Sequence, residues 1–499
     1  MSLHSEFIQV ARRAPERTAV FHGPDEFSYG HYAGVSARVA GALVQRFGIQ
    51  PGDRVGIWLK NCPEFVSALF GILRAGAVAV PVNNFLKAEE VAYVLADAQI
   101  DLLISDQGMQ GALEVLQRGR PSLKCFLIGE FASLPARADA LADAACGPDD
   151  LAVLIYTSGT TGHPKGAMLT HGNLQHNVAS CRVALEIGED DRITVLLPMF
   201  HSFMMTVGIL LPLTSGSGLV LIKSLHPPKN ILAEIIQHRA TVLPAIPQLF
   251  RALASAPPPA GLALRVCVSG AAPLPVEILK SFSARYPVPL VEGYGLSEAS
   301  PVVTLNPLRG VQKPGSIGLP IPEVAVSLRN DAGEAVAPGE TGEVCVRGGN
   351  VMRGYWNQPD ATAAAIRDGW LYTGDMARQD ADGYFFITDR KKDMLLVNGI
   401  NVYPREIEEV LHRYPGVKEV AVIGRADSRK GEQPVAYLAL DDGLTLDAAA
   451  VRRFLKEHLA DYKVPRDLRV LPALPRNATG KILKTALREL ERNAAGART

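Results

Sequence analysis

The sequence has no excess of charge of either sign, since its 499 residues include 51 basic and 51 acidic side chains. Without a basic surplus, no electrostatic attraction to nucleic acid is expected. Cysteine is also scarce: the six residues are scattered, and no two of them form a C-x-x-C pair. This spacing excludes a zinc knuckle and a disulfide framework. Free thiols are typical of a reducing cytosol, so we expect a cytoplasmic protein.

Long, unbroken apolar runs are missing as well. The N-terminal stretch 1–16 has no apolar region of the kind found in signal peptides. Residues 193–222 contain no Asp, Glu, Lys or Arg, but Pro198, Pro212 and the Ser-Gly repeat at 215–218 interrupt them. Such breaks would leave backbone groups unsatisfied in lipid, so we expect a strand, a loop, a buried helix and a second strand rather than a transmembrane span. Peripheral contact with a membrane stays open.

What the sequence does have is an alternation of strand-like and helix-like segments over its first 300 residues or so. This alternation predicts an α/β fold whose large N-terminal domain contains two doubly wound layers. From about residue 310, short apolar runs separated by Gly, Pro and Asn predict a small β-barrel or antiparallel sheet. The charged stretch 389–393 marks a boundary to a small α+β domain. We therefore predict two domains, 1–390 and 391–499, because one core cannot serve so long a chain.

The segment 156–166, YTSGTTGHPKG, combines glycines, hydroxyls and a lysine directly after the apolar run 151–155. Glycines let backbone N–H groups approach an anion, hydroxyls bond phosphate oxygens, and lysine adds a positive charge. The segment lacks both the Gly-Lys-Ser/Thr ending of a Walker loop and the spacing of a dinucleotide fingerprint. It predicts a polyphosphate cradle of another kind, with a flexible surface loop as the alternative. The phosphate-binding candidates are Thr157, Ser158, Gly159, Thr160, Thr161 and Lys165.

Further motifs place residues that suit the chemistry of ATP. In GYGLSE, the ring of Tyr294 offers a flat face for adenine, and Glu298 offers a carboxylate of the kind that Mg²⁺ prefers. Asp375 ends the motif YTGD and can accept both ribose hydroxyls, and Arg390 can add a donor to the same sugar. Lys481 ends the turn-rich PRNATGK, and a mobile loop can carry such a lysine into a site and out again. Each motif alone would also suit an ordinary surface turn.

In this order along the chain, the motifs resemble those of adenylate-forming enzymes: acyl-CoA synthetases, luciferases and the adenylation domains of peptide synthetases. A fifth motif, DRKKDMLLVNGINVYPREIE at 389–408, extends the resemblance to nearly the whole chain. The resemblance implies ATP, Mg²⁺ and coenzyme A as the cofactors and co-substrates of an acid–thiol ligase. A carboxylic acid would attack the α-phosphate of ATP, and a thiol would then displace AMP from the acyl adenylate.

The resemblance also implies roles for single residues. Lys481 would bridge the substrate carboxylate and the α-phosphate, and Glu298 would hold the metal. His201 would lie between the acyl pocket and the thiol channel, although a lone histidine in an apolar run is more often a core residue. Lys392 would be the hinge of a mobile small domain, and Gly399 would line the coenzyme A channel unless it serves only a turn. Adenine and ribose contacts would come from Ala271, Ala272, Gly293, Tyr294, Gly295, Ser297, Asp375 and Arg390.

The substrate prediction depends on the run 202–208, which follows His201 and contains no acidic residue. Peptide synthetases hold the substrate ammonium with an Asp near this place, so an amino acid is disfavoured. Methionines suit a deformable apolar pocket, and the predicted acyl pocket contains Phe203, Met204, Met205 and Gly270. A medium- or long-chain fatty acid is preferred. The alternatives are an aryl acid, a carrier-protein pantetheine as acceptor and a non-catalytic nucleotide-binding relative; a homodimer stays open.

Overall fold

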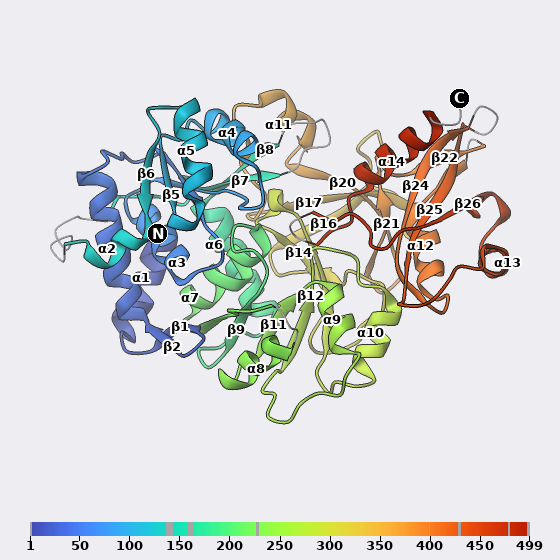
Figure 1. The fold of residues 1–499 in the computed structure, drawn as a ribbon, viewed down its shortest axis with the longest axis horizontal. Helices are drawn as coiled ribbons and strands as arrows, with labels where there is room; N and C mark the ends of the chain where they lie inside the picture. Colours follow the sequence, from blue (N-terminus) through green and yellow to red (C-terminus); the bar gives the residue numbers. More distant parts are fainter. Residues whose placement is uncertain are drawn as a thin grey trace.

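A computed structural model describes residues 2–135, 143–157, 164–225, 229–398, 400–427, 431–477 and 480–496. In these residues the chain forms four β-sheets, three in a large N-terminal domain and one in a small C-terminal domain. Figure 1 shows the small domain, coloured orange to red, at one end of the molecule. The predicted α/β class with a large and a small domain is therefore confirmed.

The first sheet of the large domain has seven strands in the order β18-β8-β7-β4-β3-β5-β6. Its central strands are parallel and fully buried, as expected where helices cover both faces. The strands are β3 (Arg54–Trp58), β4 (Val78–Pro81), β5 (Leu102–Ser105), β6 (Lys124–Leu127), β7 (Leu151–Thr157), β8 (Lys165–Thr170) and β18 (Gly354–Tyr355). The neighbouring helices are α2 (Tyr29–Gln45), α3 (Pro63–Arg74), α4 (Ala88–Asp97), α5 (Gln110–Gly119) and α11 (Pro359–Ala365).

The second sheet has nine strands in the order β15-β14-β13-β12-β11-β9-β10-β1-β2. The strands are β1 (Thr18–His22), β2 (Asp25–Ser28), β9 (Arg192–Val195), β10 (Gly218–Leu221), β11 (Val242–Ala245), β12 (Val266–Ser269), β13 (Leu290–Gly295), β14 (Val302–Leu305) and β15 (Leu319–Pro320). The helices along it are α1 (Leu3–Arg13), α6 (His171–Ala184), α7 (Leu211–Ser215), α8 (Lys229–Gln237), α9 (Pro247–Leu253) and α10 (Val276–Ser283).

Two pairings at the edges of this sheet have no local signal in the sequence. The N-terminal hairpin β1–β2 joins the second layer, because β1 pairs in parallel with β10 rather than with a strand of the first sheet. The stretch after residue 310, where the sequence predicts a barrel, begins with β15, which pairs with β14 of this sheet, while Gly318 just before it bridges Phe385 of the third sheet. Both are edge pairings between distant segments, which local periodicity does not encode.

The third sheet is small and antiparallel. It contains β16 (Val324–Arg329), β17 (Thr341–Gly348), β19 (Ile366–Arg367), β20 (Trp370–Gln379) and β21 (Phe385–Arg390). The motif YTGD therefore lies within the long strand β20 and not in a surface turn, and Asp375 is paired with Arg390 across the β20–β21 ladder. This register brings two residues of separate motifs side by side.

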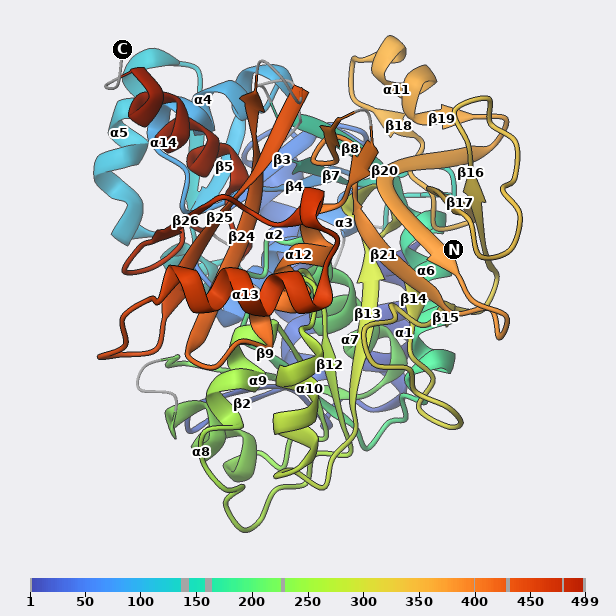
Figure 2. The same ribbon diagram turned by 90° about the vertical axis from the view of Figure 1, so that its right-hand side faces the viewer.

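The small domain has a sheet and a hydrophobic core of its own. The sheet contains β22 (Leu395–Val397), β23 (Ile400–Val402), β24 (Val417–Asp427), β25 (Gly431–Leu440) and β26 (Asp467–Val470). Its helices are α12 (Pro404–His412), α13 (Ala448–His458) and α14 (Lys484–Gly496), and Pro404 opens α12 at a position that suits proline. Figure 2 shows α12 and α13 alongside the long strands β24 and β25. Val422, Leu438 and Leu455 are among the buried residues between these elements.

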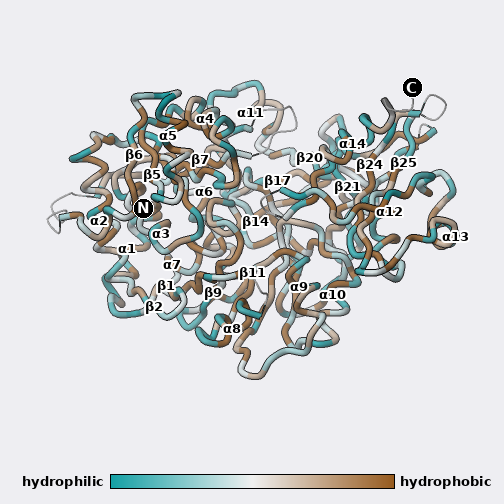
Figure 3. The backbone as a smooth tube through the Cα atoms, viewed as in Figure 1, coloured by the Kyte–Doolittle hydropathy of each residue, from teal (hydrophilic) through white to brown (hydrophobic). Residues whose placement is uncertain are grey.

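The uncharged stretch 193–222 forms the predicted strand, loop, helix and strand: β9, a π-helical segment η4 (Met204–Leu210) continuing into α7, and β10. Hydrophobic residues occupy the interior of both domains (Figure 3). No helix among the described residues is long and apolar enough to cross a membrane.

Candidate active site

The residues of the separate motifs meet in one cavity of about 1000 Å³. The ends of β7, β8, β12 and β13, the helix α6 and the segment η4 line it from the large domain. Arg476, Asn477, Lys481 and Leu483 line it from the small domain. The cavity thus lies where two α/β sheets and the small domain converge, which is a common place for a ligand site.

At one side of the cavity, Tyr294, Asp375 and Arg390 form a hydrogen-bonded cluster. The Tyr294 hydroxyl donates to Asp375 Oδ2 at 2.7 Å, and Arg390 Nε lies 2.8 Å from Asp375 Oδ1. Asp375 is only 4% exposed, and its negative charge raises the pKa of Arg390. Burial, together with the Asp375 charge, raises the pKa of Tyr294 well above its usual value, so the phenol stays protonated. Each carboxylate oxygen keeps a second lone pair that can accept a further hydrogen bond.

Small residues shape the wall beside this cluster. Gly293, Gly295, Ser297 and Ala271 line the cavity, whereas Ala272, which the motif also indicated, is not among the lining residues. A Cβ atom on Gly295 would lie 2.1 Å from the Pro301 carbonyl oxygen, so no larger residue fits there. Close packing at these positions fixes the wall of the cavity next to Tyr294.

The predicted phosphate end is only partly described. Thr157 and Lys165 face each other as a cross-strand pair of β7 and β8, and both line the cavity. Ser158, Gly159, Thr160 and Thr161 lie outside the described residues. The pair shows that β7 and β8 run antiparallel and that their facing ends border the cavity.

Tyr355, which lies in none of the sequence motifs, links this end to the predicted metal ligand Glu298. Its hydroxyl donates to Glu298 Oε1 at 2.9 Å, and Lys165 Nζ lies 5.2 Å from the centroid of its ring. The adjacent aromatic residues Tyr355 and Trp356, in an otherwise polar stretch, are the sequence signal that could have indicated a buried role. Among the described residues no group of three or more His, Cys, Asp or Glu could hold a metal ion. The single carboxylate Glu298 fits Mg²⁺, which typically uses one or two carboxylates together with phosphate oxygens and water.

Lys481 reaches the cavity from the small domain. Its exposed surface opens on the cavity, where partial loss of hydration lowers the pKa of its ammonium to about 8, with a further lowering by Arg390 and an opposing effect of Asp375. The turn before it closes through the Lys481 amide, which donates to Asn477 Oδ1 at 2.8 Å. Lys392, the predicted hinge, is also close enough to lower the Lys481 pKa, whereas Gly399 lies outside the described residues.

His201 lines the middle of the cavity. The Phe203 amide donates to His201 Nδ1 at 3.3 Å, and burial lowers the pKa of the imidazole to about 4, so the ring is neutral at pH 7. Asn61 holds the preceding loop in place: it donates to the Leu197 carbonyl and accepts from the Met199 amide, each at 2.8 Å. His201 is therefore a neutral ring in the cavity wall, held by one hydrogen bond, and not a charged base.

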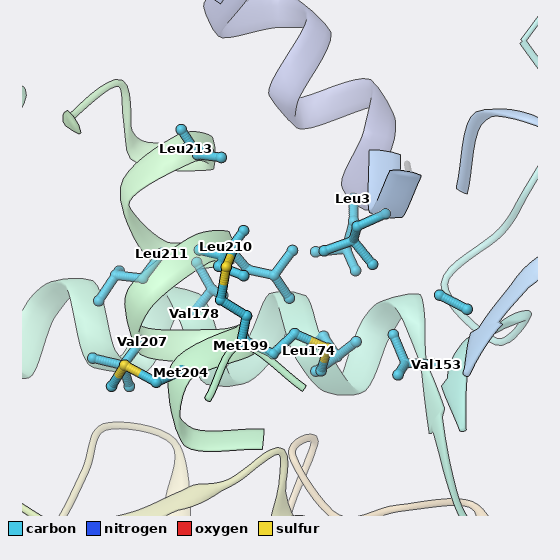
Figure 4. Packing of buried hydrophobic residues seen from close by; sticks show 14 of the residues in the cluster. Leu3, Val153, Leu174, Val178, Met199, Met204, Val207, Leu210, Leu211 and Leu213 are labelled. Carbon is cyan, nitrogen blue, oxygen red and sulfur yellow. The ribbon is translucent and has the colours of Figure 1, made fainter. Parts of the chain in front are cut away.

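Of the predicted acyl-pocket residues, Phe203 and Gly270 line the cavity, whereas Met204 and Met205 are not among its lining residues. The Phe203 ring lies 3.1 Å from the position of a Cβ on Gly270, and both residues line the cavity. Met204 and Met205 are completely buried in the hydrophobic core instead, and Figure 4 shows Met204 among core residues near Val207. Residues four apart on a helical segment share a face, so Phe203 and Val207 turn to the cavity while the two methionines turn away.

The far wall of the cavity is apolar. Besides Phe203 and Val207, its side chains are Cys181, Ala184, Leu185, Val268, Val302, Leu305 and Ile321. None of these residues carries a charge, and burial raises the pKa of the Cys181 thiol to about 12. This end of the cavity therefore offers a hydrocarbon-lined space without an ionic partner.

Comparison with known proteins agrees with this geometry. The family described as AMP-binding enzyme matches residues 7–356, and the AMP-binding enzyme C-terminal domain matches residues 406–481. A feruloyl-CoA synthase of Amycolatopsis sp is 39% identical over 96% of this chain and 97% of its own. A long-chain-fatty-acid–CoA ligase of Bacillus subtilis is 36% identical over 98% of this chain and 94% of its own. The ATP-bound crystal structure of MatB from Rhodopseudomonas palustris superposes with a TM-score of 0.91 at 31% identity, covering 98% of this chain and 99% of that one. The chain therefore belongs to the AMP-binding enzyme family, the superfamily of adenylate-forming enzymes.

Proposed function

We propose that the protein converts a neutral, largely apolar carboxylic acid, preferably a medium- or long-chain fatty acid, into its coenzyme A thioester. The chain is an AMP-forming acid–CoA ligase that uses ATP, Mg²⁺ and coenzyme A. The observation that carries the proposal is the single cavity in which Lys481 of the small domain faces Arg390, Glu298 and an uncharged apolar wall. Such a cavity can hold a nucleotide, a carboxylate and a hydrocarbon tail side by side.

In the first half-reaction, a carboxylate oxygen attacks the α-phosphorus of ATP, and the bond to pyrophosphate breaks. The Asp375–Arg390–Tyr294 cluster binds the ribose and the base, since both carboxylate oxygens retain acceptor capacity next to Tyr294. Lys481 lies between the two reacting anions and offsets their repulsion in a partly desolvated site. Its pKa of about 8 keeps most of the ammonium charged at pH 7.

Glu298 would hold Mg²⁺ together with phosphate oxygens, and the ion, when bound, neutralises charge on the phosphates and on the leaving pyrophosphate. Tyr355 fixes the carboxylate by donating to Oε1 at 2.9 Å. Lys165, at the edge of the hairpin, contributes a further positive charge on the phosphate side. We assign Thr157, Ser158, Gly159, Thr160 and Thr161 to phosphate binding on the strength of their motif.

In the second half-reaction, the thiol sulfur attacks the acyl carbon and the bond to AMP breaks. We propose that the small domain turns about Lys392 between the two steps and brings the face around Gly399 to the thiol. His201, neutral and fixed beside Phe203, lies where the acyl carbonyl and the thiol would meet. Coenzyme A is the preferred acceptor, because the relatives named above include CoA synthases and ligases.

An aryl acid is the second candidate substrate. It is favoured by the 39% identity to a feruloyl-CoA synthase and by the aromatic ring of Phe203 against Gly270, which forms a flat apolar wall. Both candidates share a neutral, apolar body, and neither needs a charged residue at the far wall. An amino acid or a second carboxylate would lack a partner there, and an unpaired buried charge is costly.

The test separates the two half-reactions. Lys481→Ala should abolish ATP–pyrophosphate exchange while supplied acyl adenylate and coenzyme A still give thioester. Lys456→Ala is the matched control, because Lys456 lies in the same domain with a 60% exposed side chain and contacts only a surface carboxylate among the ion pairs described. If Lys481→Ala keeps normal exchange, the assignment of the adenylation site is wrong.

A further inference from the structure

Arg251, at the end of α9 in the large domain, lies on the surface and belongs to none of the motifs above. We propose that it is a positioning residue that holds the small domain in the orientation in which Lys481 enters the cavity. The inference rests on the proposed function, because it concerns the half-reaction that needs Lys481. We therefore expect a change at this residue, which lies outside the cavity, to slow adenylation without slowing thioester formation.

Among the described residues, the side-chain hydrogen bonds and the ion pair given for Arg251 reach the small domain. Its Nη2 lies 2.8 Å from Asp441 Oδ1, and its Nη1 donates to the Lys418 carbonyl oxygen. Lys418 belongs to β24, and Asp441 directly follows β25. One guanidinium therefore clamps two neighbouring strand ends of the small domain, which is the planar, two-pronged contact that an arginine makes and a lysine does not.

The clamp has a rigid base on the large domain. Phe250, the residue before Arg251, is completely buried in the second core of that domain and packs edge-to-face against Phe282 of α10. The first residue before the helix, Ile246, touches the small domain as well, because its Cδ1 lies 2.8 Å from the position of a Cβ on Gly480. Both ends of α9 thus contact the small domain where the two domains meet (Figure 1).

A continuous set of contacts leads from the clamp to the catalytic lysine. Glu419, next to Lys418, accepts from Arg476 Nη2 at 2.7 Å, and Arg476 Nη1 donates to the Gly480 carbonyl oxygen. Gly480 directly precedes Lys481 and has a positive φ of 81°, a conformation that suits glycine. The clamp at Arg251 and the turn that carries Lys481 are therefore connected through Arg476 and two backbone steps, Lys418 to Glu419 and Gly480 to Lys481.

The size of the effect follows from exposure. Arg251 and Asp441 are 34% and 50% exposed, and a partly exposed pair contributes little to folding on its own. The additional bond to the Lys418 carbonyl makes the contact a charge-assisted one at two points. Its loss should change the balance between orientations of the small domain by about three- to tenfold rather than unfold either domain.

The experiment measures ATP–pyrophosphate exchange and the conversion of supplied acyl adenylate with coenzyme A for Arg251→Ala, Asp441→Ala and the double variant. We expect exchange to fall about three- to tenfold in each, thioester formation to be unchanged or faster, and the double variant to resemble Arg251→Ala because both changes remove one contact. Arg309→Ala is the control, since Arg309 pairs with Glu186 at 2.8 Å within the large domain.

Three outcomes would overturn the proposal: normal exchange in Arg251→Ala, an equal loss in both half-reactions, or additive losses in the double variant. Failure of the proposed function would look different. In that case Lys481→Ala itself would leave exchange intact, whereas failure of the clamp alone would leave Lys481→Ala inactive in exchange and Arg251→Ala normal.

Discussion

The substitution Asp375→Asn tests the nucleotide side of the site most sharply. The change keeps the shape of the side chain but removes the charge that accepts from Tyr294 at 2.7 Å and pairs with Arg390 at 2.8 Å. A hydrogen bond to a charged group is worth about 1.5 to 3 kcal/mol and a neutral one about 0.5 to 1.5 kcal/mol, so each of the two contacts weakens by about 1 kcal/mol. Because Asp375 is 4% exposed, solvent does not compensate for this loss.

The same weakening, applied to the two hydrogen bonds that Asp375 is proposed to accept from the ribose hydroxyls, is a loss of about 2 kcal/mol in ATP binding, or about thirtyfold in affinity. We therefore expect the KM for ATP in pyrophosphate exchange to rise by about this factor in Asp375→Asn. Asp380→Asn is the matched control, because Asp380 lies on the same hairpin but pairs with Lys313 at 2.6 Å and accepts from the amides of its own turn instead of bonding Tyr294 and Arg390. A KM within twofold of the unchanged protein in Asp375→Asn, or an equal rise in Asp380→Asn, would refute the reasoning.

Two further predictions concern Lys481 and the acyl wall. Because the pKa of Lys481 is lowered to about 8, the ammonium is charged below that pH and neutral above it. We therefore expect kcat/KM for ATP to fall as the pH rises through about 8. Lys481→Arg, whatever its rate, should not show this decrease in kcat/KM. Met204→Ala should lower the free energy of unfolding by about 2 to 5 kcal/mol, because Met204 is fully buried in the core, with the order of acid preference unchanged. Val207→Phe, at the cavity wall, should instead shift kcat/KM toward shorter acids with little change in melting temperature. A changed acid preference in Met204→Ala together with an unchanged preference in Val207→Phe would contradict the placement of η4.

Much of the site was predictable because its functional residues lie in short, contiguous sequence motifs. Tyr294, Glu298, Asp375, Arg390 and Lys481 each stand in a short segment whose residue types already suit phosphate, metal or ribose. The structure brings all five to or beside one cavity, as the resemblance implied. The α/β class was predictable for a similar reason, since buried parallel strands and amphipathic helices leave a local period in the sequence.

The parts that the sequence did not predict depend on distant contacts. Tyr355 reaches Glu298 only because β18 pairs with β8 across the sheet. The hairpin β1–β2 joins the second sheet through one parallel pairing with β10. Met204 and Met205 were assigned to the pocket by composition, but the π-helical turn of η4 decides which side chains face the cavity. The Arg251 clamp joins two domains and has no local signature at all.

The central claim is that one cavity couples ATP cleavage to thioester formation on an apolar acid. The direct measurement is a mass-spectrometric analysis of all products formed by the purified protein from ATP, Mg²⁺, coenzyme A and a series of acids of increasing chain length, with aryl acids, dicarboxylates and amino acids alongside. We predict AMP, pyrophosphate and the acyl-CoA in equal amounts, with kcat/KM rising about fourfold for each added CH₂, at about 0.8 kcal/mol per group, until the cavity is full. Formation of ADP and phosphate, an adenylate that never becomes a thioester, or a preference for acetate, dicarboxylates or amino acids would contradict the account.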